Sequence, residues 1–246
     1  MNGKKDGEKH TGRRLSDLLP DYPRTQHLPY NPNAQRDDLV AEDREAKVIF
    51  TSPHTYVEEK VDGANCAIMV KDGYPVMRNR NHILGKGFIA KTPAKMQFSG
   101  IWNWYYQNSK KFETVNELAG TEVGVYGEWL VAVNGIRYDK LPSVFLPFDI
   151  YDPERGYYLD PGESRRILEQ AGFNLTPLLW QGPVKDYEQL VGFCQETSPF
   201  ASERREGVYV KVGDGKKVVA RYKMVRQDFL QGCHWNAKVL TKNRLL

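Results

Sequence analysis

Residues 56–65, Tyr-Val-Glu-Glu-Lys-Val-Asp-Gly-Ala-Asn, place a lysine at the end of a β-type run and just before a bend that a glycine permits. Packing alone gives little reason for a lysine at this position, Lys60. A lysine amine becomes a nucleophile when burial or neighbouring cations lower its pKa, and a strand that ends in a cleft offers that environment. The Lys-x-Asp-Gly pattern is also typical of a surface turn, so the rest of the chain has to decide between the two.

Four further short elements follow Lys60 along the chain, and each lies in or beside a β-type run. Because residues two apart in a strand share a face, Arg221 and Lys223 are expected to point the same way and hold one phosphate. Each element also has an ordinary explanation, as a surface strand end or as core packing. In chain order the elements are Tyr126-Gly127-Glu128-Trp129, Phe148-Asp149, Glu206-Gly207-Val208-Tyr209-Val210-Lys211 and Ala220-Arg221-Tyr222-Lys223.

This order of elements resembles the covalent nucleotidyltransferase superfamily, which comprises ATP-dependent DNA and RNA ligases and mRNA capping enzymes. The resemblance spans roughly Tyr56 to Arg226 and is closest to ATP-dependent RNA ligases of the phage T4 RNA ligase 2 type. Those enzymes share Asn65, the Phe-Asp-Ile element and the Glu-Gly-x-x-x-Lys element. The chain departs from them at Asp62, where they often have histidine, and at Arg221, where lysine is usual. Arginine keeps the charge of lysine but not its shape.

The resemblance implies that Lys60 attacks the α-phosphorus of ATP, expels pyrophosphate and carries AMP as a phosphoramidate. Such a reaction needs an in-line nucleophile, a cation clamp and a divalent metal, here Mg²⁺ or Mn²⁺. Arg221 and Lys223 would hold the α-phosphate, and their charge would lower the pKa of Lys60. Glu206 would act on the metal or its waters and orient the lysine. The catalytic residues implied are Lys60, Glu206, Arg221 and Lys223.

The same resemblance implies a set of nucleotide and nucleic-acid contacts. Glu128 would contact the ribose hydroxyls, and Phe148 would stack on the adenine. Asn65 would lie near the reacting end of the nucleic acid. An arginine at the end of a strand is also expected on a phosphate; Arg80 is preferred and Arg78 is the alternative. The implied cofactor-binding residues are Lys60, Asp62, Arg78 or Arg80, Glu128, Phe148, Glu206, Arg221 and Lys223.

Outside these motifs, short β-type runs mix irregularly with helical stretches, which predicts an α+β fold with antiparallel sheets flanked by helices. Asp72-Gly73 and Gly213-Asp214-Gly215 lie between apolar runs and predict two hairpins. The expected strands are 48–51, 56–60, 66–71, 74–77, 122–131, 144–151, 207–212 and 217–223, and the expected helices are 94–112, 163–171 and 185–194.

The net charge of +4 hides an uneven distribution. From Lys216 to Leu246 there are eight basic residues and one acidic residue, which gives +7 in 31 residues. Such a basic C-terminal end favours a polyanionic partner such as a nucleotide or a nucleic acid. Solvation of a terminal helix is the alternative. The basic residues are Lys216, Lys217, Arg221, Lys223, Arg226, Lys238, Lys242 and Arg244.

Several classes of protein and site are excluded by the composition. The apolar runs are too short to span a membrane, and residues 1–14 have no apolar core of a secretory signal, so an intracellular protein is expected. The three cysteines, Cys66, Cys194 and Cys233, have no metal-site or redox spacing and are expected to be reduced and mostly buried. The five histidines show no metal-ligand spacing either.

The expected organisation is a flexible leader at 1–20 and, at 21–246, one nucleotidyltransferase domain, an ATP-grasp-like ligase adenylation domain. It includes an N-terminal arm in which Tyr22–Leu28 is similar to a segment of short RNA ligases and is expected along the nucleotide cleft. About 20 residues follow Arg226, which is too few for the OB-fold or helical domain of the relatives. An accessory protein that replaces this domain is therefore a possible partner.

The resemblance favours an ATP-dependent RNA ligase that joins a 3′-OH to a 5′-phosphate. It would adenylylate itself, transfer AMP to the 5′-phosphate, and release AMP as the 3′-OH attacks. The alternatives are a minimal ATP-dependent DNA ligase and a catalytically idle nucleic-acid-binding module of the same fold. A GTP-dependent capping enzyme is disfavoured, because such enzymes commonly have arginine where this chain has Asn65.

Overall fold

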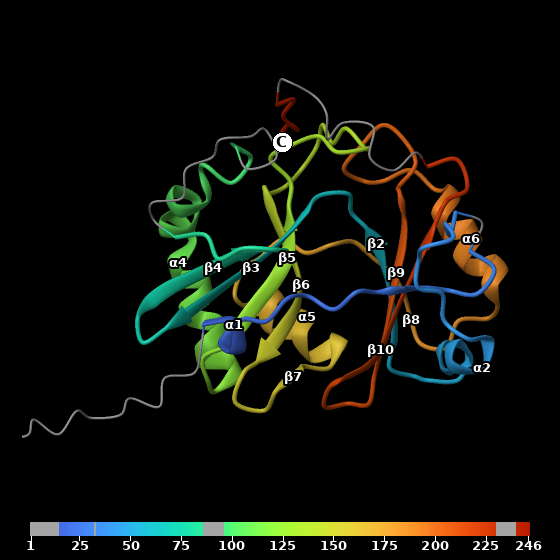
Figure 1. Ribbon diagram of the computed structural model, residues 1–246, viewed down its shortest axis with the longest axis horizontal. Helices are drawn as coiled ribbons and strands as arrows, with labels where there is room; N and C mark the ends of the chain where they lie inside the picture. Colours follow the sequence, from blue (N-terminus) through green and yellow to red (C-terminus); the bar gives the residue numbers. More distant parts are fainter. Residues whose placement is uncertain (1–14, 32, 86–95, 230–239) are drawn as a thin grey trace, which may run out of the picture.

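The computed structural model describes residues 15–31, 33–85, 96–229 and 240–246, and it contains two five-stranded sheets with helices on their outer sides (Figure 1). The strand orders are β1-β10-β9-β2-β8 and β4-β3-β5-β6-β7. Neighbouring strands of these sheets are antiparallel, except that β1 runs parallel to β10. The predicted α+β fold with antiparallel sheets flanked by helices is confirmed.

The first sheet carries the C-terminal strands of the motif series. β9 and β10 form the predicted hairpin across Gly213-Asp214-Gly215, where Gly215 has a φ of +86° that favours glycine. The outer face of the first sheet packs on the 3₁₀ helix η1 (Lys47–Phe50) and on α6 (Tyr187–Gln195). The strands are β1 (Gln26–His27), β10 (Val218–Val225), β9 (Gly207–Gly213), β2 (Thr55–Lys60) and β8 (Leu178–Gln181).

The second sheet holds the middle of the chain. β3 and β4 form the predicted hairpin, with positive φ at Asp72 and Gly73. Its outer face packs on α4 (Ile101–Ala119) and α5 (Pro161–Gln170) in the largest apolar cluster. The strands are β4 (Tyr74–Asn79), β3 (Ala64–Lys71), β5 (Gly124–Trp129), β6 (Phe145–Asp152) and β7 (Tyr157–Tyr158).

The polar inner faces of the two sheets meet between these outer cores. Val57 and Val210 pack outward, so Lys60 and Lys211, which lie on the opposite faces of their strands, point inward. Lys211 of β9 reaches Asp149 of β6 in the other sheet. The chain passes from β2 in one sheet to β3 in the other through residues 61–63. The Lys-x-Asp-Gly bend is therefore the crossing point between the sheets.

Two secondary-structure predictions need correction. Residues 48–51 do not form a strand: α2 (Asp43–Ala46) and η1 cover most of this region, and the carbonyl of Val48 accepts from the amides of Thr51 and Ser52. Burial of the fully enclosed Ile49 against the first sheet stabilises this helical turn. The helix expected at 94–112 begins at Ile101 and ends before Gly120; residues 94 and 95 lie outside the described residues.

The expected leader and some tail residues fall partly outside the described residues. Residues 1–14 of the leader, Cys233 and Lys238 are among those not described. Within residues 15–20, α1 (Leu15–Leu18) forms and Leu19 is fully buried against Ala67 and Tyr126 of the second sheet. The described part of the N-terminal arm, residues 21–31 and 33–41, then crosses from this sheet to β10 of the first sheet (Figure 1).

Candidate active site

Lys60 and Glu206 form the centre of the cleft between the sheets. Lys60 is the last residue of β2 and pairs in register with Gly207, which brings the preceding Glu206 beside it. The Lys60 Nζ lies 2.5 Å from Oε1 of Glu206. Glycine is required at 207, because a Cβ there would lie 2.0 Å from the carbonyl oxygen of Met224. The spacing of the Glu-Gly element thus fixes the carboxylate against the lysine.

The charge state of Lys60 differs from the one that the sequence suggested. Burial alone would lower the pKa of Lys60, but the carboxylates of Glu206 and Asp62 outweigh it and hold the pKa above its usual value. Arg221 does not oppose this effect, because its guanidinium is bound to Asp149. The protein without nucleotide therefore keeps Lys60 as an ammonium paired with Glu206.

Glu128 and Glu206 present two unsatisfied carboxylate oxygens to the cleft. The Oε2 atoms of both are buried and have no hydrogen-bond partner among the described residues. Burial, together with the charges of Asp62 and Glu206, raises the pKa of Glu128 to about 8, although Lys60 opposes the shift. Glu128 lies opposite Asn65 in the pairing of β5 with β3. These oxygens can accept hydrogen bonds from a ligand or bind a cation.

A pocket opens beside Lys60, between the two sheets. The ring of Phe148 lies 6.4 Å from the ring of Tyr209, and their planes differ by 21°. The two rings belong to β6 and β9, so the pocket has an aromatic residue from each sheet. Such surfaces suit a flat heteroaromatic ring. The pocket is lined by Glu58, Glu59, Lys60, Val61, Glu128, Phe148, Thr176 and Tyr209.

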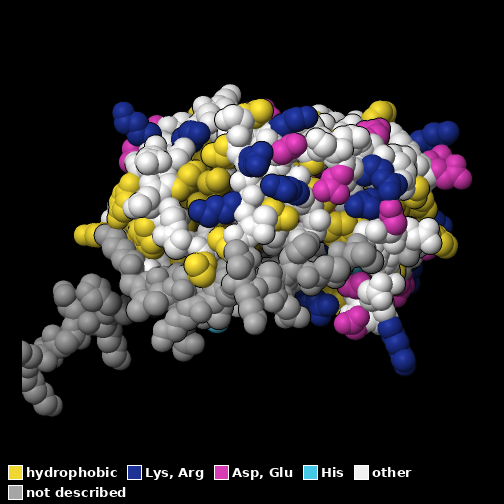
Figure 2. All heavy atoms as spheres, turned by 90° about the horizontal axis from the view of Figure 1, so that it is seen from above, with side chains coloured by type: hydrophobic (Ala, Val, Ile, Leu, Met, Phe, Trp, Pro, Cys, Tyr) yellow, Lys and Arg dark blue, Asp and Glu magenta, His cyan; other side chains and the backbone are white. Residues whose placement is uncertain are grey.

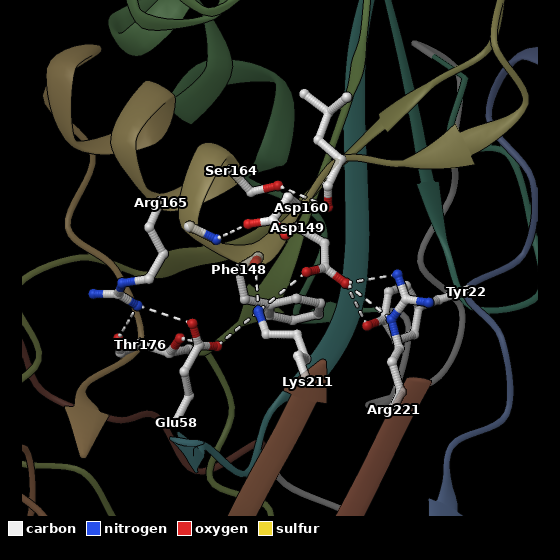
Figure 3. A network of polar contacts seen from close by, with 12 residues as sticks. Tyr22, Glu58, Phe148, Asp149, Asp160, Ser164, Arg165, Thr176, Lys211 and Arg221 are labelled. Atoms are coloured by element: carbon white, nitrogen blue, oxygen red, sulfur yellow. Dashed lines mark hydrogen bonds and ion pairs between the residues drawn. The ribbon is translucent and has the colours of Figure 1, made fainter. Parts of the chain in front are cut away.

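A buried ionic network forms the base of this pocket (Figure 3). Lys211 Nζ donates to the carbonyl of Phe148 at 2.7 Å and contacts Glu58 at 2.9 Å and Asp149 at 3.0 Å. Asp149 also accepts from the Tyr22 hydroxyl at 2.6 Å. Burial would raise the pKa of Asp149, but the charges of Lys211 and Arg221 hold it below its usual value. The network thereby holds the backbone at Phe148 in place.

Arg221 and Lys223 share a face of β10, as predicted, but their side chains have different surroundings. The Arg221 guanidinium lies 3.1 Å from Asp149 and 4.3 Å from the ring centroid of Tyr158. Its charge is therefore already neutralised. Lys223 instead lies in the field of Lys60 and Glu206, and burial followed by the Lys60 charge lowers the pKa of Lys223. Of the pair, Lys223 is the residue available to an anion.

The N-terminal arm supports the strand that carries Lys223. Tyr22 packs edge-on against Phe148, with ring centroids 5.3 Å apart, so the segment Tyr22–Leu28 lies along the cleft as predicted. His27 pairs in register with Lys223, and its Nε2 lies 3.3 Å from Oδ2 of Asp38. Burial and the Lys223 charge lower the pKa of His27 to about 4, so the ring is neutral at physiological pH.

The structure separates the two candidate arginines. Arg78 is buried; its Nη1 donates to the carbonyl of Leu19 at 2.6 Å, and its Nη2 forms an ion pair with Asp21. It is therefore committed to the arm. Arg80 is exposed, and its charge acts on both Glu128 and Lys223. This geometry supports Arg80 as the phosphate contact.

Asp62 is turned toward a neighbouring loop rather than being free for a nucleotide. Its Oδ2 accepts from the amides of Gly135 and Ile136, the latter at 3.0 Å. Its own amide donates to the Tyr138 hydroxyl at 2.8 Å. The side chain of Asp62 thus holds the bend that follows Lys60, and its charge reaches Lys60 only through space.

Sequence reasoning missed several residues of the site. Tyr209 could have been found, because it lies two residues before Lys211 on the inward face of a strand that was itself recognised. Lys211 was quoted in a motif but not given a role. Glu58 could have been found in the same way, because it lies two residues before Lys60 on the inward face of β2. Thr176 had no such signal, since it lies in a segment without a motif and reaches Glu58 at 3.1 Å only in the fold.

The positive charge of residues 216–246 does not form one patch. Arg221 is paired with Asp149, and Arg226 lies 2.9 Å from Asp228. Lys223 points into the cleft, and Lys238 lies outside the described residues. The hairpin turn holds Lys216, far along β10 from Lys223. The described basic residues of this region are close in sequence, but the fold places their side chains at separate sites.

Comparisons with known proteins bear on the family and the fold. A family model described as RNA ligase matches residues 53–225. A search of curated proteins found no match. Within the described residues, none of the helices has the length and apolar character needed to cross a bilayer.

Solved structures of RNA ligase from Naegleria gruberi share the fold. The complex with pyrophosphate is 22% identical and has a TM-score of 0.56, with 76% of this chain and 53% of that chain covered. A lysine-to-alanine variant with ATP and manganese is 19% identical and has a TM-score of 0.58, with 89% of this chain and 67% of that chain covered. Another variant, with AMP and manganese, is 23% identical and has a TM-score of 0.53, with 70% of this chain and 49% of that chain covered. This chain therefore spans about half the length of several of these enzymes.

Proposed function

Because this chain belongs to the RNA ligase family, we propose that it joins RNA ends with ATP through a lysyl-AMP intermediate on Lys60. The observation that carries the proposal is the position of the Lys60 amine. It lies at the end of β2, 2.5 Å from Glu206 and at the rim of a pocket with aromatic rings from both sheets. Of the Naegleria gruberi relatives, the structures with ATP, AMP or pyrophosphate support the choice of nucleotide.

The first step needs a neutral amine, and the site offers a route for its proton. Glu206 accepts the proton from Lys60 Nζ across their 2.5 Å contact, and burial favours this transfer because it raises the pKa of Glu206. The amine then forms a bond to the α-phosphorus of ATP, the bond from that phosphorus to the bridging oxygen breaks, and pyrophosphate leaves. Lys223 and Arg80 supply positive charge to the phosphates.

The residues present fit a divalent metal supplied with the nucleotide. Glu206 offers one buried, unpartnered carboxylate oxygen, and Mg²⁺ is commonly held by one or two carboxylates plus phosphate oxygens and waters. Among the described residues, no cluster of three His, Cys, Asp or Glu side chains forms a ready-made metal site. Bound there, Mg²⁺ or Mn²⁺ would neutralise charge on the phosphates.

The nucleotide and RNA contacts follow from the same geometry. Phe148 and Tyr209 take the adenine ring, and Glu128 takes the ribose hydroxyls. Asn65, opposite Glu128 in the sheet, faces the RNA end. AMP then passes to a 5′-phosphate, and attack by the 3′-OH of the other end seals the RNA and releases AMP. An accessory protein that binds the RNA together with this domain stays part of the proposal.

The test is incubation with a divalent metal and α-labelled ATP or GTP, followed by a denaturing gel. Pyrophosphate treatment beforehand removes any preformed adenylate. We expect a label from ATP alone in the wild type and in Lys110→Ala, an exposed lysine on α4, and no label in Lys60→Ala. A folded wild type that takes no label from either nucleotide contradicts the proposal and favours a nucleic-acid-binding module.

Sealing of nicked duplexes separates the remaining alternatives. With RNA at the 3′-OH side of the nick we expect sealing, and with DNA on both sides we expect little. Sealing of DNA alone would identify a minimal DNA ligase that uses the same lysine.

A further inference from the structure

The C-terminal tail, residues 240–246, is docked on the loop of residues 130–141. Asn243 Nδ2 donates to the carbonyls of Leu130 and Ala132, each at 2.9 Å, and its Oδ1 accepts from the amide of Tyr138 at 2.9 Å. The amide of Leu141 donates to the carbonyl of Arg244 at 3.1 Å. Three satisfied side-chain hydrogen bonds at one asparagine make this docking specific.

The docking assembles basic residues that lie far apart in sequence. Arg244 is bonded through its backbone to Tyr138 and Leu141, so it lies next to Arg137 and Lys140 of the loop. Lys242 forms a bridge with Ala132 of the same loop. We call the four side chains Arg137, Lys140, Lys242 and Arg244 the seam cluster, and all four are exposed.

The charges of the seam cluster are free, in contrast to most arginines of this fold. Within the described ranges no ion pair involves any of the four, whereas Arg165, Arg205 and Arg221 are each paired with a carboxylate. Two carboxylates adjoin the seam cluster, and both accept hydrogen bonds: Asp139 from Ser202, and Glu203 from the amide of Arg137. Four cations against two anions leave an excess of positive charge.

The seam cluster is connected directly to the bend that carries the catalytic lysine. The Tyr138 hydroxyl and the amides of Gly135 and Ile136 hold Asp62, two residues after Lys60. Arg137 lies between Ile136 and Tyr138 in the chain. Figure 2 views the side on which Figure 1 places the C-terminus; its dark blue Lys and Arg side chains lie among magenta Asp and Glu and yellow apolar side chains. A polyanion bound at the seam cluster would lie on the loop that holds the bend after Lys60.

We propose that the seam cluster binds the sugar-phosphate backbone of the RNA whose 5′-phosphate receives AMP from Lys60, an inference that rests on the proposed function. Exposed, unpaired Arg and Lys side chains suit phosphates, which carry no sequence information, and within residues 130–141 and 240–246 the one aromatic residue, Tyr138, is fully buried. We therefore expect contacts to phosphates rather than to bases. An acidic protein partner is an outcome that the test separates.

The experiment compares a seam variant with a matched control. The seam variant is Arg137→Gln, Lys140→Gln, Lys242→Gln and Arg244→Gln. The control removes four exposed cations elsewhere: Lys47→Gln, Lys110→Gln, Arg155→Gln and Lys185→Gln. Binding of a fluorescent nicked RNA duplex is measured by anisotropy between about 50 and about 200 mM NaCl, and adenylylation is measured on the same samples.

For the seam variant we expect a shallower dependence of affinity on salt. Four phosphate contacts correspond to a loss of about 3.6 in the slope of log affinity against log salt, so affinity would change about 100-fold less over this range. Adenylylation and the melting temperature should match those of the control. The control should keep the wild-type slope to within about one contact.

Two results overturn the inference: an unchanged slope in the seam variant, or an equal loss in the control. RNA binding that is the same in the wild type and the seam variant, together with polyglutamate binding that the seam substitutions abolish, would assign the seam cluster to an acidic protein. Failure of the proposed function is distinct, because it appears as absent adenylylation of Lys60 while the salt slope still responds to the seam substitutions.

Discussion

Replacing Lys211 with methionine is expected to destabilise the protein by about 3–5 kcal/mol. The side chain is 1% exposed, and its ammonium contacts two carboxylates and one carbonyl. Each bond to a charged group contributes about 1.5–3 kcal/mol, so the three contacts together would give about 4.5–9 kcal/mol. Methionine keeps the buried aliphatic stem, and Glu58 and Asp149 each retain an arginine partner, so the lower figure applies.

Urea unfolding followed by fluorescence measures this loss, with Lys110→Met as the control. For a chain of this size about 1 kcal/mol lowers the melting temperature by about 2–4 °C, so Lys211→Met should lower it by about 6–20 °C. The control should stay within about 0.5 kcal/mol of wild type, because its side chain is exposed. A loss below about 1 kcal/mol for Lys211→Met, with an unchanged m-value, would refute the view that a buried network supports the pocket.

Three further predictions concern the rim of the cleft. Glu206→Gln removes the main charge that raises the pKa of Lys60, so Lys60 becomes neutral at lower pH. Acetylation of Lys60 without nucleotide, measured by mass spectrometry, should therefore begin at lower pH than in the wild type. An unshifted pH profile of acetylation contradicts the pairing of Lys60 with Glu206. Arg78→Ala should cost about 2–4 kcal/mol of stability, whereas Arg80→Ala should leave the melting temperature unchanged and reduce adenylylation; the reverse pattern would exchange their roles. Asp62→Asn keeps the shape of the side chain but weakens its bonds to the loop of residues 130–141. The variant should therefore be less stable and should also have a higher KM for RNA in nick sealing, and a wild-type KM would argue against a positioning role.

The centre of the site could be predicted from the sequence because it depends on strand pairing. Glu206 stands beside Lys60 since the residue after it pairs with Lys60, and the order of the motifs already suggested adjacent strands. The inward faces of β2 and β9 follow from the alternation of apolar and polar residues. The two hairpins were predicted for the same reason, from glycine-containing turns between apolar runs.

The remaining features depend on contacts that periodicity does not encode. Arg78 lies in β4 and Arg80 follows the end of that strand, so the sequence pattern alone does not choose between them, and only the arm that binds Arg78 separates them. The engagement of Arg221 by Asp149 joins residues 72 positions apart in two different sheets. The raised pKa of Lys60 also depends on the contact between Arg221 and Asp149, because this contact keeps the Arg221 charge away from the Lys60 amine.

Peptide mapping of the adenylylated protein tests the central claim most directly. After incubation with ATP and Mg²⁺, tandem mass spectrometry should find one adenylyl group, on Nζ of Lys60, that is lost in acid as expected for a phosphoramidate. Lys223→Ala should lower the amount of this adduct without moving it to another residue. An adenylyl group on a different lysine, or intact protein with ATP bound only noncovalently, would contradict the assignment of Lys60 as the nucleophile of this cleft.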